Sequence, residues 1–320
     1  MILLRLLILL ALCRAATSNT CGQVCGLRPV PYSTTRIVGG VNVPPGTGAW
    51  AGIVSIQSIR TEKWSSHKCG GTIIRPKWVL SAAHCFINRT NPLSEWAVLA
   101  GIIGTAEVGP HVQLRRIKQV QLQELYDGRG RLLHDIALLE LEQPFECTPS
   151  IQLACLPGPT VTLSPLNCYV AGWGSTQAKT VASQGSILKE AKVLLIDTQL
   201  CNSSDWYGGL LLPGNLCAGY EKGGVSTCKG DSGGPLICKD GKADIFWEIG
   251  LTSYGIGCAR AKKPTVFVST QYYYNWIMKH IGQSPATPAP VQPCPFPHKK
   301  LQQFFDLLQE LLKFVKAATA

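Results

Sequence analysis

The sequence predicts an all-β fold, either a barrel or a sandwich. Short apolar runs recur along the chain, and residues that interrupt regular structure (Gly, Pro and Asn) separate them. The runs cover residues 50–59, 69–75, 96–103, 136–141, 168–173, 234–239 and 245–254. The chain has 320 residues and 46% hydrophobic content, enough for one large domain or two small ones with a sizeable core.

Residues 1–16 have the pattern of a secretory signal peptide, because Arg5 precedes an apolar run that ends in small residues. A membrane-spanning helix needs about 20 apolar residues, and Arg5 and Arg14 interrupt this run. We therefore expect a protein that is secreted or held in a secretory vesicle. Two N-glycosylation sequons, at Asn88 and Asn202, agree with that route.

Cysteine content and charge fit the same compartment. The chain has 14 cysteines, and removal of Cys13 with the signal leaves 13, which suggests six disulfides and one thiol, assigned to Cys294. The net charge of +11 predicts attraction to polyanions, and secretion favours sulfated glycans over nucleic acid. The alternative, a basic surface without a binding role, fits the composition equally well.

The C-terminal part divides into three segments. Residues 270–281 are expected to form a helix that closes the domain. Residues 283–298 contain six prolines and are expected to form a linker. Residues 299–320 carry apolar side chains at helical spacing, which predicts an amphipathic helix that packs on a partner or on the domain rather than on a membrane.

The strongest chemical signal is Gly230-Asp231-Ser232-Gly233-Gly234-Pro235. A serine hydroxyl becomes a good nucleophile only when a base takes its proton and N–H groups stabilise the oxyanion that forms. Here the backbone N–H groups of Gly230 and Ser232 are the expected donors. Glycine turns that contain serine are common, so this motif alone is weak evidence.

Two further segments supply the partners that such a serine needs. His84 lies beside Cys85, and a histidine suits proton transfer because its pKa lies near working pH. Asp135 opens an apolar strand, where a buried carboxylate can orient an imidazole. Taken singly, His84 could be an ordinary histidine and Asp135 a strand-start cap. Together they predict the catalytic residues His84, Asp135 and Ser232.

With these motifs in that order, the chain resembles the trypsin/chymotrypsin family of serine endopeptidases over about residues 36–282. The other matching motifs are Ile37-Val38-Gly39-Gly40 and Ala171-Gly172-Trp173-Gly174. The resemblance implies two packed six-stranded antiparallel β-barrels with a C-terminal helix, and peptide hydrolysis without a metal or cofactor. It also implies protein substrates and serine protease inhibitors as partners.

The same resemblance implies activation by cleavage after Arg36, with the new ammonium of Ile37 pairing with Asp231. Residues 17–36 would remain attached as a light chain to a protease domain of residues 37–282. The implied disulfides are Cys69–Cys85, Cys168–Cys238, Cys201–Cys217 and Cys228–Cys258, with Cys21 and Cys25 joined to Cys147 and Cys155 in one order or the other.

The substrate pocket implied by the family departs from the trypsin pattern. The implied pocket residues are Ser226, Thr227, Lys229, Ser253, Gly255 and Thr265. Ser226 stands where trypsin-like members carry an aspartate that pairs with Arg or Lys, and Thr265 stands where they usually carry glycine. A buried guanidinium without its carboxylate is disfavoured, so we expect medium or small apolar residues to be preferred.

Within the family, Cys25–Arg28, Leu200–Ser203, Gly257–Lys262 and the proline-rich tail resemble the acrosins, proteases of the sperm acrosome. This resemblance implies an acrosomal location, a role in penetration of the egg coat, and sulfated glycans or egg-coat glycoproteins as partners. A second hypothesis is a glycan-binding adhesion protein with a vestigial cleft. Its support is the altered pocket and the basic residues Arg115, Arg116, Lys118, Arg129, Arg131, Arg260, Lys262 and Lys263.

Overall fold

The computed structural model describes residues 25–26, 41–43, 50, 52–61, 64–87, 92–106, 109–128, 132–162, 167–177, 186–239 and 245–282. Several expectations concern positions outside these ranges. They are the signal peptide, Cys21, Arg36, Ile37, Asn88, Arg129, Arg131, the proline-rich linker, the C-terminal amphipathic helix and Cys294.

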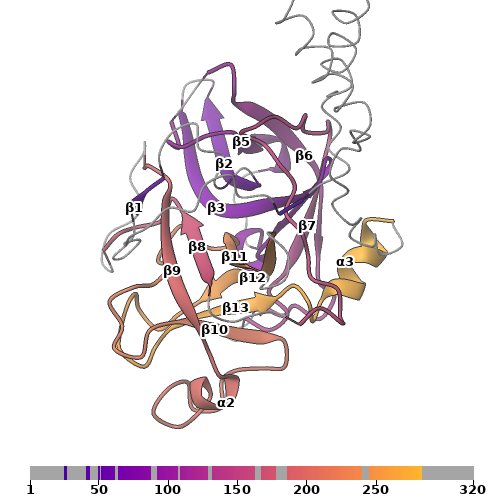
Figure 1. The fold of residues 1–320 in the computed structure, drawn as a ribbon. Helices are drawn as coiled ribbons and strands as arrows, with labels where there is room; N and C mark the ends of the chain where they lie inside the picture. The colour runs from indigo at the N-terminus through magenta and orange to yellow at the C-terminus, as the bar shows by residue number, and fades with distance from the viewer. Residues whose placement is uncertain are drawn as a thin grey trace, which may run out of the picture. The chain divides into compact units, whose positions relative to one another are not determined.

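The first half of the described chain forms a closed antiparallel barrel with the strand order β2-β3-β4-β7-β6-β5 (Figure 1). Its strands are β2 (Ile53–Thr61), β3 (Trp64–Arg75), β4 (Trp78–Ser81), β5 (Trp96–Ala100), β6 (Gln113–Leu122) and β7 (Ala137–Leu141). Successive side chains of a strand point to opposite faces, and the inward set, including Ile56, Val98 and Leu139, fills the interior. Two short 3-10 turns, η1 (Ala83–Cys85) and η2 (Leu93–Glu95), lie between strands.

The second half forms another closed barrel, because β8 pairs with β9 and so joins the two ends of the order β9-β10-β13-β12-β11-β8. Its strands are β8 (Cys168–Gly172), β9 (Lys189–Ile196), β10 (Asn215–Gly219), β11 (Pro235–Lys239), β12 (Phe246–Tyr254) and β13 (Thr265–Ser269). A two-residue strand, β1 (Val41–Asn42), pairs with β9. The expected pair of six-stranded antiparallel barrels is therefore confirmed.

A C-terminal helix, α3 (Tyr274–His280), follows β13 and confirms the helix expected near residues 270–281. Although α3 continues from the second barrel, its buried side chains Ile277 and Met278 share one apolar cluster with Ile74 and Leu138 of the first barrel. This packing joins the end of the second barrel to the first. A shorter helix, α2 (Thr198–Cys201), precedes β10 at the lower end of the second barrel (Figure 1).

Five disulfides lie among the described residues. They are Cys25–Cys155, Cys69–Cys85, Cys168–Cys238, Cys201–Cys217 and Cys228–Cys258. Four of them match the expected pairs, and the fifth resolves the alternative left open for Cys25. Cys147 is also disulfide-bonded. Its expected partner, Cys21, is not among the described positions.

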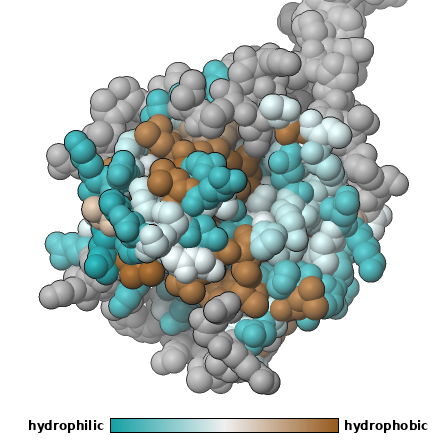
Figure 2. All heavy atoms as spheres, turned by 90° about the horizontal axis from the view of Figure 1, so that it is seen from below, coloured by the Kyte–Doolittle hydropathy of each residue, from teal (hydrophilic) through white to brown (hydrophobic). Residues whose placement is uncertain are grey.

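The face that carries α2 mixes apolar and polar side chains. Seen from this side, the apolar residues form several separate groups rather than one continuous patch (Figure 2). Leu194, Leu200 and Leu210 are among the exposed large apolar side chains. In the described part of the chain, no helix is long and apolar enough to cross a membrane.

Candidate active site

His84 and Asp135 form a directly bonded pair in the first barrel. His84 lies on η1, directly after β4, and the Cys69–Cys85 disulfide fixes the adjoining residue. Its Nδ1–H donates to Asp135 Oδ2 at 2.7 Å, and its backbone N–H donates to Asp135 Oδ1 at 2.8 Å. The imidazole is 24% exposed, whereas the carboxylate is fully buried. This arrangement leaves Nε2 of His84 as the nitrogen available for chemistry.

The second barrel contributes a third donor to the same carboxylate. The hydroxyl of Ser253, at the end of β12, donates to Asp135 Oδ2. Asp135 therefore accepts hydrogen bonds from both barrels, and its side chain cannot rotate without losing them. The sequence placed Ser253 in the substrate pocket, and the structure shows that its hydroxyl also holds the carboxylate.

Ser232 lies in a glycine-rich turn that is attached to both barrels. Its carbonyl accepts a hydrogen bond from Gly70 N–H of β3 at 2.8 Å, and Gly233 N–H donates to Thr252 of β12 at 2.8 Å. Gly233 has φ +76°, and a Cβ there would overlap the hydroxyl of Ser81. Only glycine suits this position, because it combines a left-handed backbone with a close contact.

A short chain of contacts connects this turn to the segment that carries His84. Gly70 follows Cys69, and Cys69 is disulfide-bonded to Cys85, the neighbour of His84. Among the described residues, neither Ser232 Oγ nor His84 Nε2 makes a hydrogen bond. Such contacts are often loose in an unliganded enzyme and tighten with substrate.

The backbone N–H groups of Gly230 and Ser232 also make no hydrogen bond within the described chain, although their neighbours do. Asp231 N–H donates to Cys228 O at 3.0 Å, and Gly234 N–H donates to Asp231 O at 2.9 Å. Gly230 has φ +98°, a conformation that glycine adopts without strain. Two free donors on either side of a bonded residue match the requirements of an oxyanion site.

The carboxylate of Asp231 points away from this turn into the second barrel. Its oxygens accept hydrogen bonds from Gly174 N–H at 2.7 Å and Cys228 N–H at 2.8 Å. Burial raises the pKa of Asp231 to about 6, and these two hydrogen bonds only partly oppose the effect. No described residue forms an ion pair with Asp231. A buried carboxylate of this kind is stabilised by a cation that reaches it.

A histidine that the sequence did not single out holds the carbonyl of Gly230. Burial lowers the pKa of His67 to about 4, so the ring is neutral at physiological pH. His67 Nε2–H donates to Gly230 O at 2.8 Å, and Nδ1 therefore accepts from the hydroxyl of Ser55, 2.7 Å away. The position of His67, two residues before a disulfide cysteine in β3, is the only signal of this role in the sequence.

Three residues of the expected substrate pocket, Ser226, Thr227 and Thr265, bond to one another through their hydroxyl groups. Ser226 Oγ donates to Thr227 O at 2.7 Å and must therefore accept from Thr265 Oγ1, 2.9 Å away. Thr265 Oγ1 in turn accepts from Thr227 Oγ1 at 2.9 Å. All three side chains are buried. Each hydroxyl hydrogen is thus committed within the protein, and Thr265 occupies space that a glycine would leave open.

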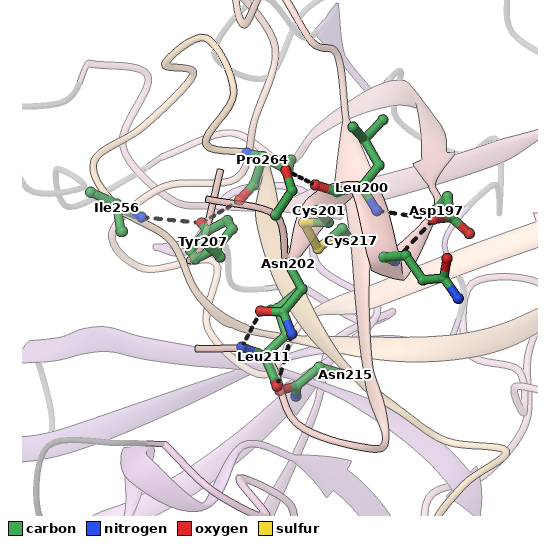
Figure 3. The surroundings of a disulfide bond; sticks show 12 residues. Asp197, Leu200, Cys201, Asn202, Tyr207, Leu211, Asn215, Cys217, Ile256 and Pro264 are labelled. Atoms are coloured by element: carbon green, nitrogen blue, oxygen red, sulfur yellow. Dashed lines mark hydrogen bonds between the residues drawn. A yellow bond between two sulfur atoms is a disulfide. The ribbon is translucent and has the colours of Figure 1, made fainter. Parts of the chain in front are cut away.

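Tyr207 contacts two segments that adjoin expected pocket residues (Figure 3). Its hydroxyl donates to Pro264 O at 2.6 Å and accepts a longer contact from Ile256 N–H at 3.4 Å. Pro264 directly precedes the expected pocket residue Thr265, and Ile256 directly follows the expected pocket residue Gly255. The segment that carries Tyr207 is anchored by the Cys201–Cys217 disulfide. Another residue of the expected pocket, Lys229, is exposed.

The Asn202 sequon lies in the same segment (Figure 3). Asn202 Oδ1 accepts from Leu211 N–H at 3.0 Å, and Nδ2 contacts Leu211 O at 3.5 Å. The amide therefore holds the loop closed, and glycosylation of Asn202 stays a prediction. The only candidate cluster of metal ligands in the described ranges is Cys69, His84 and Cys85. Its two cysteines form a disulfide and cannot bind a metal as thiolates.

The fold and this geometry agree with comparisons to known proteins. Residues 37–277 match the trypsin family, so the chain belongs to the trypsin family of serine proteases. One curated relative is the human protein "Transmembrane protease serine 5", which is 37% identical over 267 residues, covering 81% of this chain and 55% of the relative. The chain thus spans about half the length of that relative.

Proposed function

We propose that this protein is a serine endopeptidase. The observation that carries the proposal is the fully buried Asp135, which holds His84 through two hydrogen bonds. The Cys69–Cys85 disulfide and the hydrogen bond from Gly70 to Ser232 connect the segment of His84 to the turn of Ser232. Membership of the trypsin family supports the same reaction. Protein substrates and serine protease inhibitors are the partners that follow from it.

In the proposed mechanism, His84 Nε2 takes the hydroxyl proton of Ser232 as Oγ attacks the peptide carbonyl. The carbonyl oxygen becomes an oxyanion, which the free N–H groups of Gly230 and Ser232 stabilise. His84 then gives the proton to the leaving amine, and an acyl-enzyme remains. Water, deprotonated by His84, attacks the ester and restores Ser232. Asp135 keeps the proton on Nδ1 of His84, so that Nε2 is the basic nitrogen.

The environment of Asp231 supports activation by cleavage after Arg36. The carboxylate is buried, has two N–H donors and lacks a cation among the described residues. The ammonium of Ile37, formed by cleavage, would supply that cation. Because Asp231 lies between Gly230 and Ser232, the ion pair would fix the two oxyanion donors. The protein would therefore be made as a zymogen.

The buried hydroxyl groups of Ser226, Thr227 and Thr265 support a preference for medium or small apolar residues before the scissile bond. Ser226 provides no carboxylate for Arg or Lys. The hydroxyl groups of Ser226, Thr227 and Thr265 offer a guanidinium only uncharged acceptors, which bind it less strongly than a carboxylate. Thr265 also shortens the pocket. An aromatic side chain would have to displace this buried hydroxyl cluster.

A secretory location and an acrosin-like role in penetration of the egg coat are part of the proposal. Five described disulfides support an oxidising compartment. The acrosomal location and any glycan or egg-coat partner rest on the short sequence motifs alone. The glycan-binding alternative gains no specific support from the basic residues: Lys118 pairs with Glu140 at 2.7 Å, and Lys262 pairs with Asp205 at 3.1 Å.

The proposal is tested with the full chain cleaved after Arg36 and assayed on peptides bearing Val, Ala, Leu, Phe or Arg before the scissile bond. We expect hydrolysis after Val, Ala or Leu, and a loss of about 10⁶-fold in kcat for Ser232→Ala. Hydrolysis that survives in Ser232→Ala would overturn the proposed nucleophile. Efficient cleavage after Arg would instead overturn the pocket assignment and leave the reaction standing.

A further inference from the structure

His134, the residue before Asp135, has a backbone conformation that side chains rarely adopt. Its φ is +55°, and only two other non-glycine residues in the described ranges, Ala259 and Lys262, have positive φ. A left-handed backbone at a residue with a full side chain is strained and persists only when its surroundings enforce it. Such strain next to a proposed catalytic residue calls for a physical cause.

The left-handed conformation produces a tight turn that aims Asp135 inward. Ile136 N–H donates to His134 O at 2.8 Å, so the chain reverses around Asp135. On the inner side of this turn, the Asp135 carboxylate meets the three donors from His84 and Ser253. If the backbone of His134 relaxed to negative φ, the carboxylate would point elsewhere.

The side chain of His134 is held by a buried tyrosine from the other barrel. His134 Nδ1 lies 2.7 Å from the hydroxyl of Tyr273, and the two rings meet edge to face with an interplanar angle of 86°. Tyr273 directly precedes α3 and is 6% exposed. The hydrogen bond therefore attaches the turn to the segment that packs the second barrel against the first.

The Tyr273 hydroxyl is a stable partner for an imidazole. Burial, with smaller contributions from Tyr272 and the charge of Asp135, raises the pKa of Tyr273 to about 12. The hydroxyl thus stays protonated at any working pH, and either group can donate in the bond. The same packing limits its movement, because Ile277 N–H of α3 donates to Tyr273 O at 2.9 Å.

We propose that His134 is a positioning residue for catalysis: its hydrogen bond to Tyr273 maintains the left-handed backbone that aims Asp135 at His84. The inference rests on the proposed protease activity. It assigns His134 no contact with substrate and no role in proton transfer. Its effect appears in kcat rather than in substrate binding, since the pocket is formed by other segments.

The test uses the full chain cleaved after Arg36 with a peptide substrate that the wild type hydrolyses. Tyr273→Phe removes only the hydroxyl, and His134→Gly removes the imidazole while permitting positive φ. We expect each to lower kcat about tenfold with little change in KM, because small errors in the position of a catalytic group are costly. The double variant should lose no more than either single variant, since both remove one interaction.

Tyr272→Phe is the matched control, because it deletes the same atom from the adjacent tyrosine, which is 56% exposed. It should hydrolyse peptides like the wild type. Labelling of Ser232 by a fluorophosphonate separates the two proposals. Failure of the wild type to label would refute the protease assignment itself. Normal labelling and wild-type kcat in Tyr273→Phe and His134→Gly, even with lowered thermal stability, would refute only the role of His134.

Discussion

Two buried acids have opposite surroundings: Asp135, which precedes β7 and contacts the end of β12 through Ser253, and Glu248, which lies on β12 near its start. At the end of β12, Ser253 and His84 give Asp135 three hydrogen bonds. Near the start of β12, Glu248 is buried, and neither of its carboxyl oxygens has a hydrogen-bond partner among the described residues. Burial accordingly raises the pKa of Glu248 to about 8, and the nearby Thr72 hydroxyl of β3 opposes this only weakly. Hydrogen-bond donors, rather than burial, therefore decide whether a buried acid beside β12 is stable as an anion.

The largest expected effect comes from changing Asp135, the acid with three hydrogen-bond donors. Asp135→Asn keeps the size of the side chain, but its amide can no longer accept from both His84 N–H groups. The imidazole would then adopt the tautomer with its proton on Nε2. We expect kcat to fall about 10⁴-fold with a small change in KM. Steady-state kinetics would measure this, with folding checked by thermal unfolding. A loss below tenfold would show that Asp135 is a structural acid.

A change at Glu248 should alter the stability of the chain and leave its catalytic rate unchanged. The pKa of Glu248 is raised from 4.5 to about 8 in the folded chain, so the unfolded chain ionises first as pH rises. The contribution of Glu248 to the free energy of unfolding therefore falls between pH 4.5 and 8, by about 5 kcal/mol in total. Glu248→Gln removes this loss. Its stability relative to the wild type should rise across that window in urea unfolding.

Glu142→Gln, at an exposed position, is the control for Glu248→Gln and should show a flat difference with pH. An equally flat difference for Glu248→Gln would mean that the carboxyl group is solvated in the native state. Measurements in a Ser232→Ala chain prevent self-digestion.

Asp231, with two donors, lies between these extremes and gives the smallest effect. Its pKa is raised from 3.8 to about 6, so ionisation destabilises the uncleaved chain by about 3 kcal/mol as pH rises through that window. Asp231→Asn should stabilise the uncleaved chain by this amount at pH 7 relative to pH 3.5. After cleavage at Arg36, the advantage should vanish, because Ile37 would pair with the carboxylate. An advantage that persists after cleavage would contradict the activation proposal.

The sequence predicted the parts of the fold and site that short motifs encode. The glycine turn around Ser232 and the pair of His84 and Asp135 could be predicted from residue type and order, and the family resemblance implied the four disulfides. The strands that matched apolar runs, such as β7 and β12, were also predictable. In contrast, β6 (Gln113–Leu122) was not predicted, because Ile117 is its only buried side chain and most of its other residues are charged or polar.

The contacts that sequence reasoning missed join residues distant along the chain. His67 and Gly230 are 163 residues apart, and His134 and Tyr273 are 139 apart. Such pairs depend on how the two barrels pack, which no local pattern encodes. Glu248 left one trace, a lone acid inside an apolar strand. That pattern gives no indication whether donors surround the acid.

Closure of both barrels has a consequence for the proposed protease activity. A peptide in a protease cleft is bound in extended form through its backbone N–H and C=O groups. In the two barrels those groups are already paired with neighbouring strands, and closure removes the free edges that most open sheets have. The strands are thus poor substrates for another copy of the same enzyme. We therefore expect self-digestion by an active chain to be confined to segments outside these strands.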